Sequence, residues 1–173
     1  MNTLLIKSIK STFENKFRTE PIMIFSPGRI NIIGEHTDYN DGFVFPAAVD
    51  KGIVAAIGKS DSKLSIAFAA DKKETLEFSL NQIKPLAQGS WQNYILGVVA
   101  EIQNRSKTIG DFNIVFGGDI PGGAGMSSSA ALENSVVFGL NTLFSLGLSK
   151  DDMILISQKA EHNYVGVKCG IMD

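Results

Sequence analysis

Residues 117–130 combine glycines and serines in an order that favours the binding of an anion. The stretch reads GGDIPGGAGMSSSA, and it lies between a predicted strand and a predicted helix. Glycines let backbone N–H groups approach a ligand closely, and a helix N-terminus carries about half a positive charge. The serine hydroxyls add groups that can contact phosphate oxygens or Mg²⁺. The segment predicts a phosphate-binding loop, and the alternative that stays open is a glycine-rich turn before a serine-capped helix.

Other motifs for nucleotides or nucleophiles do not fit this loop. A Walker A loop requires a Gly-Lys pair, but no lysine follows Gly125. A dinucleotide fingerprint requires glycine where Ser128 stands, and the G-x-S-x-G of a nucleophile elbow is absent.

A second polar stretch, residues 27–42, follows the first predicted strand. Glu35, His36, Thr37 and Asp38 are consecutive donors and acceptors, and Arg29 precedes them by six residues. Sugar hydroxyls both donate and accept hydrogen bonds, so such a cluster suits carbohydrate recognition. A fixed guanidinium suits phosphate oxygens. The competing interpretation is an ordinary solvated turn.

Apolar spacing predicts the elements that position these two stretches. A helix is expected over 2–17, ended by Pro21, and further helices over 91–104, 127–146 and from a Ser149 cap to about residue 164. Short apolar or alternating runs predict strands at 22–25, 43–49, 52–58, 63–70, 75–80 and 112–116. This order predicts an α+β fold in which a mixed, largely antiparallel sheet packs against helices.

Composition excludes several classes of protein. The 173 residues carry 16 Lys plus Arg and 18 Asp plus Glu, a net charge of −2, which leaves no basic footprint for nucleic acid. No apolar run reaches the roughly 18 residues of a membrane span, and Lys7 and Lys10 interrupt the apolar run that a signal peptide needs. The single cysteine, Cys169, excludes an internal disulfide within the chain. A cytoplasmic domain that acts on small molecules is expected.

Three stretches together resemble a known family. Residues 28–44 (GRINIIGEHTDYNDGFV) resemble the galactokinase signature, residues 121–129 (PGGAGMSSS) resemble the ATP-binding motif of the GHMP kinases, and residues 161–166 and 169–173 resemble a third family motif. The resemblance implies a GHMP-kinase N-terminal domain, similar to ribosomal protein S5 domain 2. It also implies transfer of the γ-phosphoryl group of ATP to the C1 hydroxyl of galactose, which gives α-galactose 1-phosphate.

The resemblance also implies a role for each matched residue. Asp173 would be the general base and Arg29 would stabilise the transferred phosphoryl group. Ser129 and Glu161 would hold Mg²⁺. The galactose contacts would be Glu35, His36, Thr37, Asp38 and Gly170. The ATP phosphates would lie against Gly123, Ala124, Gly125, Met126, Ser127, Ser128 and Ser129.

The motifs leave several alternatives open. The resemblance covers 1–173 as a sugar- and ATP-binding domain, with the second GHMP domain absent, so this length is expected to be inactive alone and to self-associate through the face meant for that domain. The same motifs fit a kinase for N-acetylgalactosamine or another sugar. A protein of a different class, a non-catalytic regulator that binds galactose and ATP, is the further alternative.

Overall fold

The computed structural model describes residues 2–34, 37–40 and 42–172. Its main elements, in chain order, are α1 (Thr3–Phe17), β1 (Ile22–Asn31), β2 (Pro46–Lys59), β3 (Ser65–Ala69), β4 (Glu74–Phe78), α2 (Trp91–Asn104), β5 (Phe112–Gly118), α3 (Ser128–Phe144) and α4 (Lys150–Ala160). A short 3₁₀ turn, Asp38–Asn40, lies between β1 and β2, and a π-helix, Glu161–Val165, continues α4. Among the described residues, no helix is both long and apolar enough to cross a membrane.

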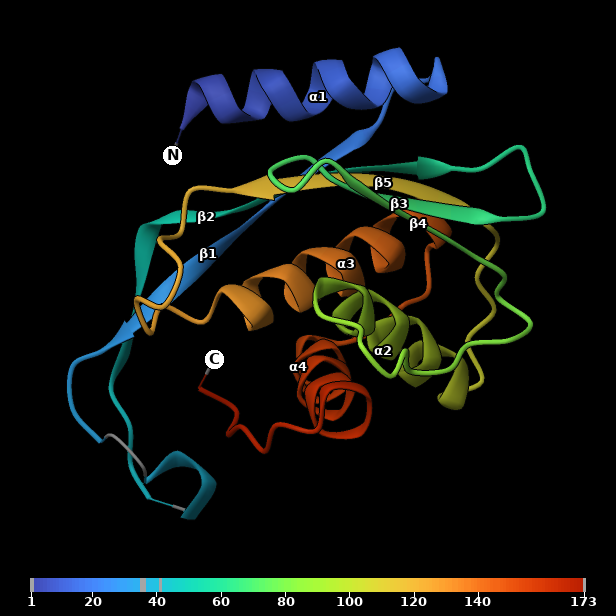
Figure 1. Ribbon diagram of the computed structural model, residues 1–173. Helices are drawn as coiled ribbons and strands as arrows, with labels where there is room; N and C mark the ends of the chain where they lie inside the picture. The colour runs from blue at the N-terminus through green and yellow to red at the C-terminus, as the bar shows by residue number, and fades with distance from the viewer. Residues whose placement is uncertain (1, 35–36, 41, 173) are drawn as a thin grey trace.

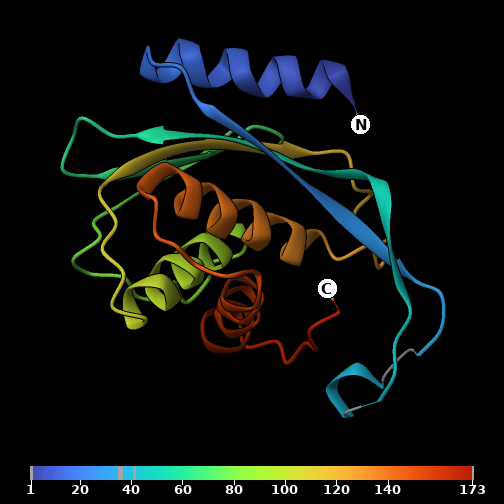
Figure 2. The ribbon, with the colours of Figure 1, turned by 180° about the vertical axis from the view of Figure 1, so that it is seen from behind.

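The five strands form one mixed sheet in the order β1-β2-β5-β3-β4. Neighbouring strands are antiparallel except β3 and β5, which are parallel. Helix α1 covers one face of the sheet and α2 and α3 lie on the other, with α4 packed against α2 and α3 on the side away from the sheet, as the opposite views in Figures 1 and 2 show. The predicted α+β class with a mixed sheet is therefore confirmed.

Two apolar cores hold these layers together. The larger core lies between the sheet and α2, α3 and α4, and it includes the fully buried Ile57, Ile114 and Leu140. The smaller core lies under α1, where Ile9 and Phe13 meet the other face of the sheet. Each buried side chain of this size contributes roughly 1.5–3 kcal/mol, so the helices that carry the candidate site are packed onto a stable sheet.

Most helix boundaries agree with the prediction. Asn2 caps α1 by accepting a hydrogen bond from the Leu5 N–H, and α2 has the predicted bounds. Pro21 is not the stop signal for α1, because the helix already ends at Phe17 and is followed by Arg18 in the left-handed conformation (φ 58°). A left-handed residue after a helix redirects the chain without a proline.

Two predicted boundaries within the sheet are wrong. The first strand was expected over 22–25, but β1 continues to Asn31, so Arg29 lies on a strand and not in a polar loop. The runs 43–49 and 52–58 were expected to be separate strands, but β2 is continuous from Pro46 to Lys59 and pairs with the whole of β1. Gly52 does not mark a turn here. A Cβ on Gly52 would overlap the Ser26 carbonyl and the Phe25 ring, so this glycine permits close packing of paired strands.

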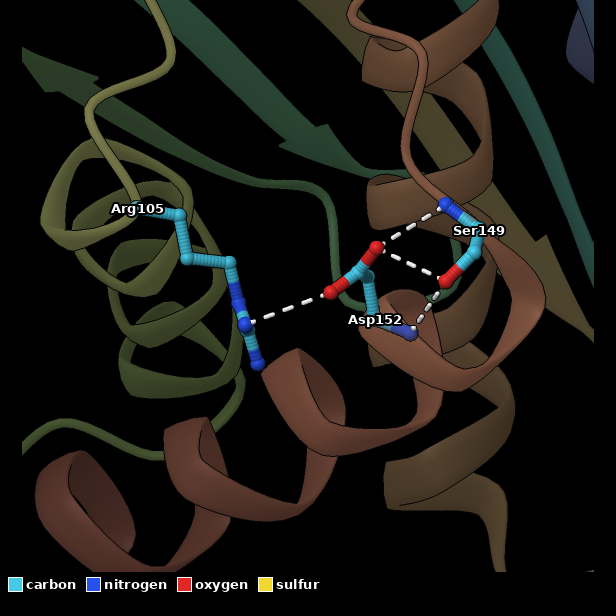
Figure 3. Close-up of polar contacts among 3 residues, drawn as sticks. All are labelled: Arg105, Ser149 and Asp152. Atoms are coloured by element: carbon cyan, nitrogen blue, oxygen red, sulfur yellow. Dashed lines mark hydrogen bonds and ion pairs between the residues drawn. The ribbon is translucent and has the colours of Figure 1, made fainter.

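Helix α4 begins with a reciprocal cap. The Ser149 hydroxyl accepts from the Asp152 N–H (3.1 Å), and the Asp152 carboxylate accepts from the Ser149 N–H (3.1 Å) and hydroxyl (2.7 Å). Arg105, just after α2, contacts the same carboxylate at 3.4 Å (Figure 3). These groups fix the start of the helix that carries Glu161 at its other end.

We expect Ser149→Ala to lower the free energy of unfolding by about 1 kcal/mol at pH 7, because the Asp152 N–H loses its acceptor and the Asp152 carboxylate loses the hydroxyl donor. The hydrogen bonds from Ser149 lower the pKa of Asp152. The stability that the ionised Asp152 carboxylate gains from these bonds is therefore present above the ordinary Asp pKa of about 3.9. It is lost as the pH falls through the lowered pKa. Urea unfolding of both chains at pH 7 and near pH 3 measures the effect. Ser149→Thr keeps the hydroxyl and is the control, and equal losses in the two variants would contradict the capping role.

Candidate functional site

The segment 119–127, called the glycine-serine loop below, joins β5 to the N-terminus of α3, as the sequence predicts. Gly123 and Gly125 have positive φ angles of 70° and 64°, a conformation that favours glycine. A Cβ on either residue would meet nothing within 4 Å, so there is open space beside the loop. Ser127 occupies the cap position of α3, but its side chain makes no capping hydrogen bond. The Ser127 side chain therefore does not cap α3.

Arg29 on β1 connects the polar signature stretch to this loop. Its Nη1 donates to the Gly125 carbonyl at 2.7 Å, and its backbone N–H donates to the Met126 carbonyl at 3.2 Å. The preceding Gly28 permits the contact, because a Cβ there would lie 2.7 Å from the Met126 carbonyl oxygen. The guanidinium is thereby held beside the loop that is predicted to bind phosphate.

The third motif reaches the same place. Met172 lines a cavity of about 270 Å³ together with Arg29 on β1 and Ser127 at the start of α3. Figure 1 shows the C-terminal segment in red below the start of α3, on the side of the sheet that carries α2, α3 and α4. Segments separated by more than a hundred residues thus converge on one region.

The segment that joins β1 to β2 carries the residues predicted to contact the sugar and is called the sugar-signature turn. The structure describes only part of it. Glu35 and His36 lie outside the described residues, as does Asp173. Asp38 begins the 3₁₀ turn, and its Oδ2 accepts from the Met172 N–H at 3.1 Å. The Thr37 hydroxyl lies within hydrogen-bond distance of the Gly34 carbonyl (2.6 Å) and the Phe43 carbonyl (2.9 Å), so it shapes the turn itself.

Ser129 and Glu161 both lie near Tyr94 of α2. Burial raises the pKa of Tyr94, and the charges of Glu161 and Glu133 raise it further, whereas a hydrogen bond with Ser129 acts in the opposite direction. Glu161 is only 5% exposed. A hydroxyl and a carboxylate are oxygen donors of the kind that Mg²⁺ takes, and Mg²⁺ keeps several waters. Among the described residues, no group of three or more His, Cys, Asp or Glu side chains is placed to hold a metal ion.

An aromatic cavity next to the loop was not predicted as part of the site. It measures about 350 Å³ and is lined by Trp91, Tyr94, Phe116 and Ser129, among others. The Trp91 indole donates to the Glu74 carboxylate at 2.6 Å and packs edge-on against Phe116. An apolar cavity with an oriented aromatic ring suits a planar ligand such as a nucleotide base. Trp91 and Tyr94 follow helical spacing in the sequence, which is typical of core residues.

Two family descriptions match the chain. Residues 11–59 match the galactokinase galactose-binding signature, and residues 93–173 match the GHMP kinases N-terminal domain. A galactokinase from Clostridium perfringens strain 13 is 42% identical over 172 residues, which is 97% of this chain and 44% of that protein. A galactokinase from Haemophilus influenzae strain PittGG is 44% identical over 173 residues, again 97% of this chain and 44% of the relative. The chain thus spans less than half the length of these curated relatives.

Solved structures give the same result. The crystal structure of Lactococcus lactis galactokinase complexed with galactose is similar with a TM-score of 0.90 and 34% identity, over 96% of this chain and 44% of that one. The Methanococcus jannaschii mevalonate kinase structure has a TM-score of 0.77 at 22% identity, over 90% of this chain and 50% of that one, and it supports the fold alone.

Proposed function

The chain belongs to the GHMP kinase family and corresponds to the N-terminal part of the galactokinases, and from this premise we propose that it supplies the sugar and nucleotide sites of a galactokinase. The observation that carries the proposal is the bond from Arg29 to the Gly125 carbonyl, since it joins the sugar signature to the phosphate loop. Because the chain spans 44% of its relatives' length, catalysis is proposed for a protein of the full length of those relatives, termed the full-length protein below.

ATP lies along the aromatic cavity and the loop. The base occupies the cavity beside Trp91 and Tyr94, and the phosphates lie against residues 123–129 at the N-terminus of α3. Ser129 and Glu161 hold Mg²⁺, which neutralises phosphate charge when it is bound. The protein's own contribution is the position of these groups, because phosphoryl transfer asks an enzyme mostly for positioning and charge stabilisation.

Galactose lies between the signature turn and the third motif. Glu35, His36, Thr37 and Asp38 contact its hydroxyls together with the Gly170 backbone. Asp173 accepts the proton of the C1 hydroxyl as the C1 oxygen forms its bond to the γ-phosphorus. The bond from that phosphorus to the oxygen bridging the β- and γ-phosphates breaks, Arg29 stabilises the transferred group, and galactose 1-phosphate and ADP leave.

The chain's partners and location follow from the same proposal. Its small-molecule partners are galactose and ATP, and the cytoplasm supplies both. Phe43 is fully exposed and Ile33 is 71% exposed on the β1–β2 turn, and large exposed apolar side chains favour contact with another surface. We expect the 173-residue chain alone to self-associate through such surfaces.

A coupled ADP-release assay tests the proposed function. The full-length protein is expected to release ADP with galactose and to act far less on N-acetylgalactosamine or glucose, whereas the 173-residue chain turns over too slowly to measure. Preference for N-acetylgalactosamine would replace the substrate assignment. Binding of galactose and ATP without ADP release would replace the enzyme by a regulator. Light scattering of the short chain records its self-association in the same samples.

A further inference from the structure

The segment 166–172, called the strap below, runs from the π-helix to the sugar turn. It leaves the π-helix at Gly166, whose positive φ of 82° turns the chain back. The strap has little regular secondary structure of its own, so its position depends on the groups that bind its backbone. Its start is held by the Gly166 and Val167 N–H groups, which donate to the Glu161 carbonyl (2.9 and 3.3 Å), and two further anchors hold its middle and its C-terminal part.

The first anchor holds the strap to α4. The Cys169 carbonyl accepts from the Gln158 amide (Nε2, 3.2 Å) and lies 2.9 Å from His162 Nε2. A carbonyl can only accept, so this contact requires the His162 tautomer that carries its proton on Nε2. Gln158 and His162 are four residues apart, and this spacing places both donors on one side of the helical segment.

The second anchor joins the strap to Asp38. The Met172 N–H donates to Asp38 Oδ2 at 3.1 Å. Gly170 packs so closely on the same carboxylate that a Cβ on this glycine would overlap it. A shift of the strap therefore must move Asp38 or separate it from the strap.

We propose that Gln158 and His162 are positioning residues for galactose, which act through the Cys169 carbonyl and the strap on Asp38. This inference rests on the proposed function, because it takes Asp38 and the Gly170 backbone as sugar contacts. Neither donor touches the sugar. The loss of both hydrogen bonds is expected to weaken galactose binding about tenfold, which corresponds to about 1.4 kcal/mol.

The test uses the full-length protein with the double variant Gln158→Met and His162→Phe, which keeps side-chain bulk and removes both donors. The galactose KM is expected to rise about tenfold, while the ATP KM stays within about twofold. The single variant His162→Gln, in which Gln158 is unchanged, keeps a donor at both positions. Its galactose KM is expected to lie close to that of the unmutated protein. Lys159→Met changes the exposed neighbour on the same helix and is the matched control.

Each outcome separates the inference from the proposed function. An unchanged galactose KM with a lower concentration of active enzyme would overturn the inference, since the anchors would then serve folding alone. If the unmutated protein shows no phosphoryl transfer, the proposed function fails. Calorimetry with galactose alone then decides the inference: a dissociation constant raised about tenfold in the double variant supports it, and an unchanged constant or no galactose binding at all overturns it.

Discussion

Replacing Arg29 with methionine is expected to lower kcat of the full-length protein by about 10³-fold, the lower end of what an arginine that stabilises a transferred phosphoryl group contributes. The guanidinium is held against the phosphate loop by the 2.7 Å bond to the Gly125 carbonyl, so it is already oriented before ATP binds. Methionine keeps an unbranched stem about as long as the aliphatic part of arginine and removes the guanidinium with its charge. Single-turnover kinetics with saturating galactose and ATP measures the transfer step directly.

Two further arginine variants make this result specific. Arg29→Lys keeps a point charge without the planar guanidinium, and its kcat is expected to lie between those of the unmutated protein and Arg29→Met. Arg18→Met removes an exposed arginine next to α1, on the opposite face of the sheet, and is expected to leave kcat unchanged. Retention of more than a tenth of the activity in Arg29→Met would show that another group stabilises the phosphoryl charge.

For Asp173→Ala in the full-length protein, we expect loss of at least 10³-fold in kcat with ATP binding preserved. A positioned general base contributes roughly 10²–10⁴-fold, and here no other residue is assigned to take the C1 proton. Asp173 itself lies outside the described residues, but Met172 lines the cavity that also contains Arg29 and Ser127. Rapid-quench kinetics measures the transfer, and calorimetry with a non-hydrolysable ATP analogue measures binding.

The control for this variant is Asp61→Ala, which removes an exposed carboxylate in the turn before β3. Its activity is expected to equal that of the unmutated protein. Persistence of transfer in Asp173→Ala would disprove the assignment of the base. A parallel loss of nucleotide binding would instead mean that the substitution disturbs the whole site.

The sequence was informative where local signals agree with tertiary packing. The bounds of α2 follow from apolar spacing alone, and the Ser149 cap of α4 follows from capping chemistry. The continuity of β2 could not be predicted, because Gly52 looks like a turn residue until the Phe25 ring is seen packing on it. Whether a glycine bends a chain or admits a neighbour depends on residues far away in the sequence.

The candidate site divides in the same way. The phosphate loop and the signature turn are contiguous stretches with unusual composition, so they were visible in the sequence. The cavity around Trp91 and Tyr94 was not, since aromatic residues at helical spacing are typical of a core. The anchoring of the Cys169 carbonyl was also invisible, because a backbone acceptor leaves no trace in the residue types. Contacts of that kind become apparent only in three dimensions.

The π-helix at the end of α4 requires a fixed number of residues between Ala160 and Gly166. The π turn is closed by the i→i+5 bond from the Gly166 N–H to the Glu161 carbonyl (2.9 Å), so removing one residue from Glu161–Val165 would break this bond and change the path of the chain that follows. Gly166 would then start in another direction, and Met172 would no longer reach Asp38. Substitutions within this turn alter single contacts. A deletion or insertion would separate the strap, and with it Asp38, from α4.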